Sequence, residues 1–141
     1  AAVEKACTIA RDMGAKRTVP LSVSAPFHCS LLKPAGLALK NELDNIQIKN
    51  PEVPVVSNVE ALPVKDADHI RKLLVQQVSS PVRWEDSIRY MIQQGIEVFI
   101  EVGPGRVLNG FLKKISNKIK GYNVEDLKSL EITMEGLGGT V

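Results

Sequence analysis

His28 is the residue of this sequence whose type and position suit catalysis. It lies in an expected loop, residues 24–32 (SAPFHCSLL), directly after a short strand expected over residues 17–23. Histidine is the natural general base near neutral pH, and functional groups of α/β folds gather where strands end. A loop histidine hydrogen-bonded to the backbone is the simpler interpretation of the local sequence, so His28 stands here as a candidate general base.

The remaining cysteine and histidine residues favour structural roles. Cys29 is expected to be a small packed residue, because adjacent side chains usually diverge and would not form a dyad with His28. Cys7 lies on the apolar side of a predicted helix, where we expect it in the core. His69 lies near the start of another helix, where we expect it to face solvent. These four residues follow no zinc-site spacing, so no metal is expected.

A glycine-rich turn in residues 101–110 (EVGPGRVLNG) joins an expected strand to an expected helix. This arrangement could cradle an anion at the start of the helix. The specific nucleotide motifs are absent, because GxGxxG would need glycine where Leu108 stands and no Gly-Lys-Ser/Thr follows. We therefore expect a tight turn that lets the helix pack closely on the sheet, and no nucleotide site.

Hydrophobic periodicity outlines helices that alternate with short strands. The expected helices cover residues 2–13, 34–45, 66–78, 85–94 and 106–120, with a helical or mixed tail over 124–137, and the expected strands cover 17–23, 53–59 and 96–102. Asp66 or Asp68 caps the third helix, and Gly95 ends the fourth. The alternation predicts an α/β fold with a largely parallel sheet. Three strands are few for such a sheet, and the chain opens at Ala1 inside a helix, so we expect part of a longer protein.

The composition argues against several classes of protein. The chain has 141 residues, of which 44% are apolar and 24% charged, as in one globular domain. A net charge of +2 and only 4% aromatic residues argue against a nucleic-acid partner. No apolar run approaches the roughly 20 residues that cross a bilayer, so no membrane partner is expected. With 2 Cys there is no disulfide framework, which favours the cytoplasm.

The expected helix over residues 106–120 separates charge from apolar surface. It contains basic residues on one side and no acidic residue. The basic residues are Arg106, Lys113, Lys114, Lys118 and Lys120, and the opposite face holds Leu108, Phe111, Leu112, Ile115 and Ile119. A solvated face is the default explanation of this charge. A docking surface for an acidic partner is the functional alternative.

Several segments, taken in order, carry a resemblance to a known family. They are residues 14–17 (GAKR), 23–29 (VSAPFHC), 32–35 (LKPA), 54–59 (PVVSNV), 77–84 (QVSSPVRW) and 101–108 (EVGPGRVL). Each segment is weak alone, but their ordered set is specific and spans nearly the whole chain. The sequence resembles malonyl-CoA:acyl-carrier-protein transacylase of dissociated fatty acid synthesis.

The resemblance implies a two-step acyl transfer. In the family, a serine in a GHSLGE-type elbow attacks the malonyl thioester, and a histidine takes the serine proton and then protonates the leaving thiol of coenzyme A. The phosphopantetheine thiol of acyl carrier protein then accepts the malonyl group. By the matching segments that histidine is His28, and the backbone carbonyl that orients it belongs to Gln77. Coenzyme A enters as part of the substrate malonyl-CoA, and no cofactor is implied.

Other residues receive roles from the same resemblance. Phe27 and Asn58 are assigned to substrate binding. In related polyketide acyltransferase domains, phenylalanine at the position of Phe27 accompanies malonyl selection, whereas serine there accompanies methylmalonyl selection. The basic residues Arg106, Lys113 and Lys114 become the expected contact for the carrier protein.

Several sequence motifs of the family are absent from this chain. No GxSxG occurs in the sequence, and neither the GQGSQ-type block nor the arginine that pairs with the malonate carboxylate is present. The chain therefore resembles the carboxyl-terminal half of an α/β-hydrolase-like acyltransferase. On that mapping residues 1–22 close a ferredoxin-like small subdomain and residues 23–141 belong to the large subdomain. We expect the nucleophilic serine on a missing amino-terminal half, no turnover by this chain alone, and exposed strand edges and apolar surface.

Two alternatives stay open from the sequence. One is a piece of an acyltransferase from a polyketide pathway. The other is a non-catalytic fragment or interaction subunit, which the missing serine favours for the isolated chain. The intact segments around His28 and Gln77 favour descent from a working enzyme.

Overall fold

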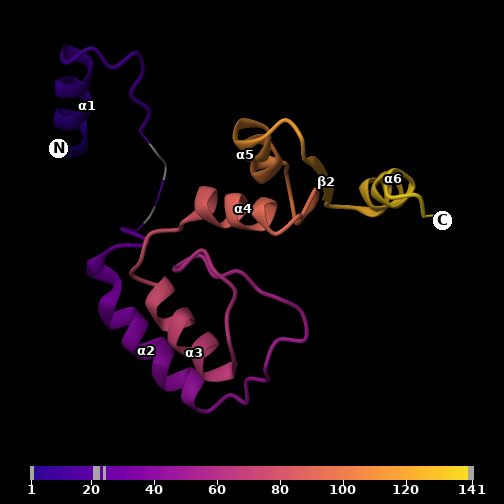
Figure 1. The fold of residues 1–141 in the computed structure, drawn as a ribbon. Coiled ribbons are helices and arrows are strands. Elements are labelled where there is room, and N and C mark those ends of the chain that lie inside the picture. Colours follow the sequence, from indigo (N-terminus) through magenta and orange to yellow (C-terminus); the bar gives the residue numbers. More distant parts are fainter. Residues whose placement is uncertain (1, 21–22, 24, 140–141) are drawn as a thin grey trace.

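A computed structural model describes residues 2–20, 23 and 25–139 of the chain. Its elements are, in chain order, α1 (Ala2–Asp12), the 3₁₀ turn η1 (Ser30–Leu32), α2 (Lys33–Asp44), α3 (Ala67–Gln77), α4 (Trp84–Gln93), β1 (Val98–Val102), α5 (Val107–Ile115), β2 (Lys120–Val124) and α6 (Leu127–Gly136) (Figure 1). Helices thus alternate with a small parallel sheet, which confirms the mixed α/β class. Within the described residues, none of these helices has the length and apolar character to cross a membrane.

The strongly periodic segments fold as the sequence predicts. Helices α1, α2, α3 and α4 coincide with the expected helices to within a few residues. The side chain of Asp66 accepts a hydrogen bond from the His69 backbone N–H at 2.8 Å and caps α3. Gly95 follows α4 with a φ of 87°, a left-handed conformation that suits glycine. The local capping and periodicity signals are sufficient to place these helices.

The predicted strands over residues 17–23 and 53–59 are wrong in the described residues. Residues 17–20 and 23 are outside any strand, and residues 21–22 and 24 lie outside the described part of the chain. In the second segment only Val56 forms an isolated antiparallel bridge, with Pro63. The chain turns back there through Ala61, which has a φ of 57°. Each segment also contains a proline, which cannot donate a hydrogen bond to a neighbouring strand.

The prediction of one helix over residues 106–120 is also wrong. Helix α5 ends at Ile115, because Ser116 takes an extended conformation with φ −155° and ψ 141°. The next residues form β2, which pairs in parallel with β1 from Val98 opposite Lys120 to Val102 opposite Val124. Lys118, Lys120 and Ile119 are consequently not on the basic helix.

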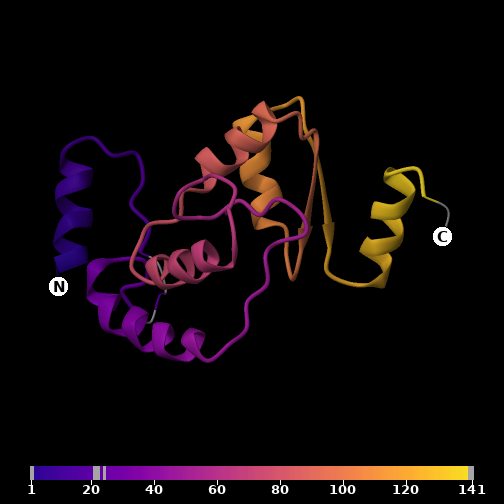
Figure 2. The ribbon, with the colours of Figure 1, turned by 60° about the horizontal axis from the view of Figure 1, so that its bottom comes forward.

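The packed parts are a helix pair and a sheet flanked by helices. Figure 2 shows α2 and α3 side by side, and their contact is close at Gly36, where a Cβ would lie 3.1 Å from the Val75 carbonyl oxygen. The largest apolar side chains of the core are Leu43, Leu73, Ile88 and Leu112. Helices α1 and α6 lie toward opposite ends of the molecule in both views (Figures 1 and 2).

Much apolar surface is exposed, as the sequence led us to expect. Val98, Ile100 and Val102 of β1 are 38%, 45% and 80% exposed. We call these three residues the open β1 face. Helix α1 buries none of its residues, and Cys7 is only partly covered, so the expectation that it lies in the core is wrong. An apolar surface of this extent is typical of an interaction site.

Replacing Ile88 with alanine is expected to lower the free energy of unfolding by about 2–5 kcal/mol, because the side chain is fully buried and its removal leaves a cavity. Urea unfolding followed by circular dichroism measures the change. Ile46→Ala is the matched control, since Ile46 is 53% exposed and its truncation should cost less than about 0.5 kcal/mol. Equal losses in the two variants would show that Ile88 is not a core residue.

Candidate active site

His28 lies on a tight loop with unusual backbone geometry. Its φ is 58°, in the left-handed region that non-glycine residues rarely adopt. The loop around it is held by a hydrogen bond from the Phe27 N–H to the Ala25 carbonyl at 2.9 Å and by a contact of 3.1 Å from the Cys29 thiol to the Pro26 carbonyl. Cys29 is thus engaged with the backbone, and among the described residues no hydrogen bond joins its thiol to the His28 ring. Such strained positions occur often at functional sites.

The His28 ring reaches the end of helix α3. Its Nδ1 atom lies 3.2 Å from the backbone carbonyl oxygen of Gln77, the last residue of that helix. The final carbonyls of a helix have no partner within the helix and are free to accept a hydrogen bond. When Nδ1–H donates to this carbonyl, Nε2 carries the lone pair and points away from the contact. The structure therefore brings together the two residues that the sequence paired, across 49 positions of chain.

A small apolar cavity adjoins Gln77, and His28 is not among the residues that line it. It has a volume of about 230 Å³, and both Gln77 and Asn58 line it. The backbone carbonyl of Asn58 accepts a hydrogen bond from the Arg83 N–H at 2.9 Å, which joins the loop before α3 to the start of α4. Phe27 is 58% exposed and does not line the cavity. Of the two predicted substrate-binding residues, only Asn58 therefore shares a pocket with Gln77.

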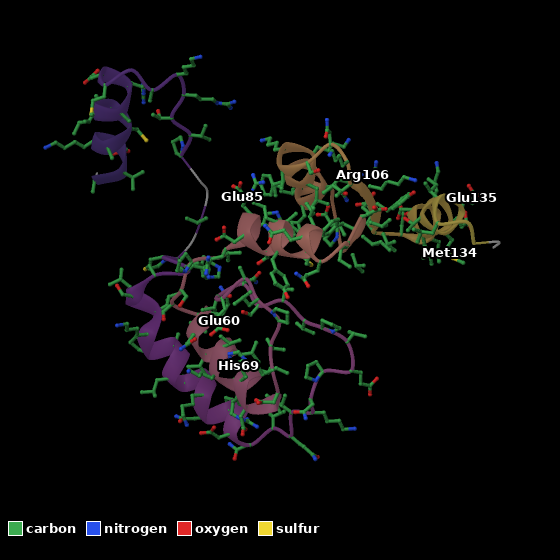
Figure 3. All side chains as sticks on the ribbon, in the orientation of Figure 1. Glu60, His69, Glu85, Arg106, Met134 and Glu135 are labelled. Atoms are coloured by element: carbon green, nitrogen blue, oxygen red, sulfur yellow. The ribbon has the colours of Figure 1, made fainter. Side chains whose placement is uncertain are left out.

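His69 is not the solvent-facing residue that we expected. Its side chain is only 15% exposed, and Nε2 lies 3.2 Å from a carboxylate oxygen of Glu60. Its Nδ1 accepts a hydrogen bond from the Lys65 N–H at 3.2 Å, so the proton of the neutral ring is on Nε2. Figure 3 shows both labelled side chains beside α3. The sequence could not place Glu60 there because its position depends on the turn over residues 58–62, which the bridge between Val56 and Pro63 closes.

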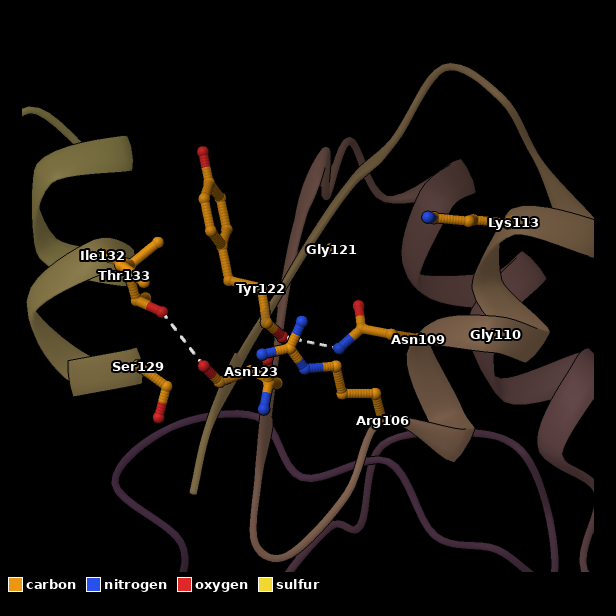
Figure 4. Close-up of a pocket in the computed structure, with 10 residues that line it drawn as sticks. All are labelled: Arg106, Asn109, Gly110, Lys113, Gly121, Tyr122, Asn123, Ser129, Ile132 and Thr133. Atoms are coloured by element: carbon orange, nitrogen blue, oxygen red, sulfur yellow. Dashed lines mark hydrogen bonds between the residues drawn. The ribbon is translucent and has the colours of Figure 1, made fainter. Parts of the chain in front are cut away.

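Arg106 and Lys113 line a second pocket, of about 350 Å³, between α5 and α6 on either side of β2 (Figure 4). No acidic residue is among the residues that line it. Arg106 Nε lies 3.9 Å from a carboxylate oxygen of Glu125, a loose ion pair. Lys114 lies outside this pocket, and its ammonium group is 5.9 Å from the centre of the Phe111 ring. The structure thus brings two of the three predicted docking residues into one pocket and leaves the third beside it.

The glycine-rich turn is closed by carboxylates of the protein itself. The two Glu101 oxygens accept hydrogen bonds from the backbone N–H groups of Leu108 and Asn109 at 3.1 and 2.9 Å. A Glu125 oxygen accepts from the Gly105 N–H at 2.9 Å. The start of α5 is therefore already occupied by negative charge, which agrees with the expectation of a tight structural turn.

Asn109 braces the sheet against α5. Its side-chain amide donates to Glu101 at 3.0 Å and to the Tyr122 carbonyl at 2.7 Å, so it connects β1, α5 and β2. Gly121 leaves room for this, since a Cβ at that position would collide with the Asn109 side chain. The local sequence does not indicate this role of Asn109, because its partner in β2 follows from strand pairing and not from local pattern.

The pKa of Glu101 is lowered. Partial burial raises it, but the hydrogen bonds from Asn109 and Leu108 to the charged carboxylate together outweigh burial. A group whose pKa is lower in the folded state stabilises the fold above its unfolded pKa. That contribution is lost as the pH falls through the folded value.

Glu101→Gln is therefore expected to lower stability at neutral pH and to reduce the loss of stability on acidification. Urea unfolding at neutral and acidic pH measures both effects. Glu85→Gln is the control, because Glu85 makes an exposed pair with Arg89 on one helix and such pairs contribute little. An acid-induced loss in Glu101→Gln equal to that of the unmodified chain would contradict the role of Glu101.

Curated proteins match the chain over nearly its whole length. The malonyl CoA-acyl carrier protein transacylase of Bacillus subtilis (strain 168) is 44% identical over 135 residues, 96% of this chain and 43% of that protein. The protein of the same name from Escherichia coli (strain K12) is 42% identical over 134 residues, 95% of this chain and 43% of that protein. The chain thus spans less than half the length of these relatives. No protein-family model matches it.

Solved structures agree with these matches. A malonyl CoA-acyl carrier protein transacylase from Clostridium perfringens has a TM-score of 0.89 at 45% identity, covering 97% of this chain and 43% of that one. A malonyl-transacylase in complex with a type II polyketide synthase acyl-carrier protein has a TM-score of 0.89 at 41% identity, covering 96% and 44%.

The class that these relatives define is that of acyltransferases with mixed α/β structure. Within that class, this chain is homologous to the malonyl CoA-acyl carrier protein transacylases over nearly all of its own residues. The family resemblance inferred from the ordered sequence segments is confirmed.

Proposed function

We propose that this chain supplies the general base of a malonyl transferase, which moves a malonyl group from coenzyme A to the phosphopantetheine thiol of acyl carrier protein. The observation that carries the proposal is the 3.2 Å contact between His28 Nδ1 and the Gln77 carbonyl. This contact leaves Nε2 free to accept a proton, which is what a base next to a serine nucleophile requires. The homology to malonyl CoA-acyl carrier protein transacylases supports the same assignment.

The proposed reaction has two balanced halves. A serine hydroxyl attacks the thioester carbon of malonyl-CoA, and its proton moves to Nε2 of His28. The tetrahedral intermediate collapses, the carbon–sulfur bond breaks, and the coenzyme A thiolate takes that proton. In the second half, His28 removes the proton from the phosphopantetheine thiol, the thiolate attacks the malonyl-serine ester, and the serine oxygen leaves and is reprotonated by His28.

The serine lies on the remaining portion of the transacylase, since no GxSxG occurs in this sequence. We propose that this complementary portion packs on the open β1 face, whose three apolar side chains are exposed here. In the complete enzyme, residues 23–141 would form part of an α/β-hydrolase-like subdomain and residues 1–22 would close a ferredoxin-like one. The boundary at residue 22 lies outside the described residues.

The acyl preference proposed for the site is malonyl. Asn58 lines the cavity next to Gln77, where it is suited to contact the substrate. The exposed Phe27 ring adjoins His28 in sequence and would crowd an acyl group with an extra methyl. No cofactor enters the proposed reaction, and coenzyme A is present as part of the substrate. We place the reaction in the cytoplasm, because Cys7 and Cys29 are both free thiols.

A polyketide setting is a second candidate for the same chemistry. One of the similar structures is a malonyl-transacylase in complex with a type II polyketide synthase acyl-carrier protein. The two settings use the same transfer step and differ in the carrier protein that receives the malonyl group. Comparing transfer rates to a fatty-acid and a polyketide carrier protein would separate them.

Intact-mass spectrometry tests the proposed function. The chain is combined with the complementary amino-terminal portion of a homologous transacylase and treated with malonyl-CoA. We expect the complementary polypeptide to gain one malonyl group and this chain to remain unmodified. A malonyl group on this chain would show that the nucleophile is assigned to the wrong polypeptide. If neither polypeptide is labelled although they associate, a non-catalytic interaction subunit is the better interpretation.

Reversing the charge of Lys113 and Lys114 together is expected to raise the apparent KM for carrier protein by about tenfold, because acidic partners are attracted by the basic side of α5. The KM for malonyl-CoA should stay unchanged. Lys5→Glu with Lys128→Glu is the control, since it changes the net charge equally at positions outside α5. An equal KM in both double variants would mean that the basic residues of α5 form only a solvated face.

A further inference from the structure

One atom of His28 makes two contacts that require opposite protonation states. Its Nδ1 lies 3.2 Å from the backbone carbonyl oxygen of Gln77 and 3.3 Å from the side-chain Nε2 of the same residue. The carbonyl only accepts, so it needs a proton on Nδ1. The amide nitrogen only donates, so it needs the Nδ1 lone pair. A neutral imidazole can satisfy one of these contacts at a time.

The orientation of the Gln77 amide is set by a third group. Its Nε2 also lies 3.4 Å from the Ser80 carbonyl oxygen, which can only accept a hydrogen bond. The amide oxygen in that place would face another oxygen, so the nitrogen is the atom directed toward both Ser80 and His28. The amide has two N–H groups and can serve both acceptors. The side chain is partly buried, which keeps it in this position.

In the described part of the chain, no other group forms a hydrogen bond with His28 Nδ1 that would influence the tautomer of the ring. No acidic side chain there is hydrogen-bonded or ion-paired to His28, and the residue is exposed. The backbone carbonyl and the side-chain amide of Gln77 are therefore the two groups that select the tautomer.

We propose that the Gln77 side-chain amide stabilises a fraction of His28 in the tautomer that carries the proton on Nε2. The backbone carbonyl of the same residue has the opposite effect and stabilises the tautomer that carries the proton on Nδ1. Gln77 is therefore a positioning residue whose backbone carbonyl and side-chain amide favour opposite tautomers of His28. The functional consequence rests on the proposed function, because only the Nδ1–H form has a lone pair on Nε2 for the serine proton. The Nε2–H form cannot act as the base, so its population reduces the competent fraction of the site.

Nitrogen-15 NMR of the histidine rings in the 141-residue chain tests the proposal without turnover. The spectrum is recorded about two pH units above the ordinary histidine pKa, where the rings are neutral. The chain has two histidines, and His69→Gln assigns the signals. His69 is also an internal reference, because the Lys65 N–H fixes its proton on Nε2. We expect the His28 Nδ1 signal between the protonated and unprotonated positions.

Two variants of Gln77 should change this signal in the same direction. Gln77→Leu removes the amide donor, and Gln77→Glu replaces it with a group that only accepts. Both should move the His28 Nδ1 signal toward the position of a protonated ring nitrogen. Gln76→Leu is the matched control, since the neighbouring Gln76 is exposed and takes part in neither of the His28 hydrogen-bond contacts found among the described residues. It should leave the signal unchanged.

An unmoved Nδ1 signal in both Gln77 variants, with the amide spectrum of the folded chain retained, would overturn the proposal. If Gln77→Leu disturbs the fold, Gln77→Glu alone decides, because it is closer in size and polarity. The tautomer result is independent of the mass measurement above. A moved signal together with failed malonyl transfer would leave the tautomer role standing and remove the proposed function.

Discussion

Replacing His28 with alanine is expected to slow malonyl loading of the complementary polypeptide by about 10²–10⁴-fold. Alanine cannot take the serine proton, so the hydroxyl must attack without a base. The measurement is the initial rate at which the malonyl adduct appears by intact mass, with this chain and the complementary portion at saturating concentrations. The effect belongs in the rate of loading, so the variant is compared with the unmodified chain under conditions where the two polypeptides are fully associated.

The backbone at His28 calls for a second variant. Its φ of 58° is unfavourable for alanine, so His28→Ala combines loss of the base with added strain. Asparagine tolerates the left-handed region and has no basic nitrogen. His28→Asn should therefore lose as much rate as His28→Ala while keeping the stability of the unmodified chain. His69→Ala should retain the rate. Loading within twofold of normal in His28→Asn would show that another group is the base.

Replacing Ile100 with lysine is expected to weaken association with the complementary portion at least about 100-fold, a change of about 3 kcal/mol. Ile100 is at the centre of the open β1 face and is 45% exposed in this chain. In the chain alone a lysine there extends into water, so stability should change little. In the complex it would place a charge against an apolar surface, which is costly. Isothermal titration calorimetry measures the affinity.

The matched control for this experiment is Ile46→Lys. Ile46 is also an exposed isoleucine, at 53%, but it follows α2 and is not part of the sheet. The variant adds the same charge and should bind the complementary portion normally. Normal binding by Ile100→Lys would mean that the open β1 face is not the contact surface.

The chain's helices and strand β1, which lies within the expected strand over residues 96–102, were largely predictable from sequence, whereas strand β2 was not. Helix α3 is specified within a few residues by apolar periodicity and by the capping side chain of Asp66. Strand β2 was missed because Ile119 lies four residues after Ile115 and continues the helical pattern past the true end of α5. The pairing of β2 with β1 decides its structure, and that pairing connects residues about twenty positions apart. Sequence periodicity carries no information about such a partner.

The sequence by itself determined the residue types at the candidate site and the helices that lead to it. It contains a histidine on a loop, a glutamine at the end of a helix, and a family pattern that links them. Only the tertiary structure decided that His28 Nδ1 meets both the carbonyl and the amide of Gln77, and that His69 is covered by Glu60. The reason is physical. Helix periodicity and capping act over a few residues, whereas these contacts depend on how α2 packs against α3 and how the loops fold back onto that pair.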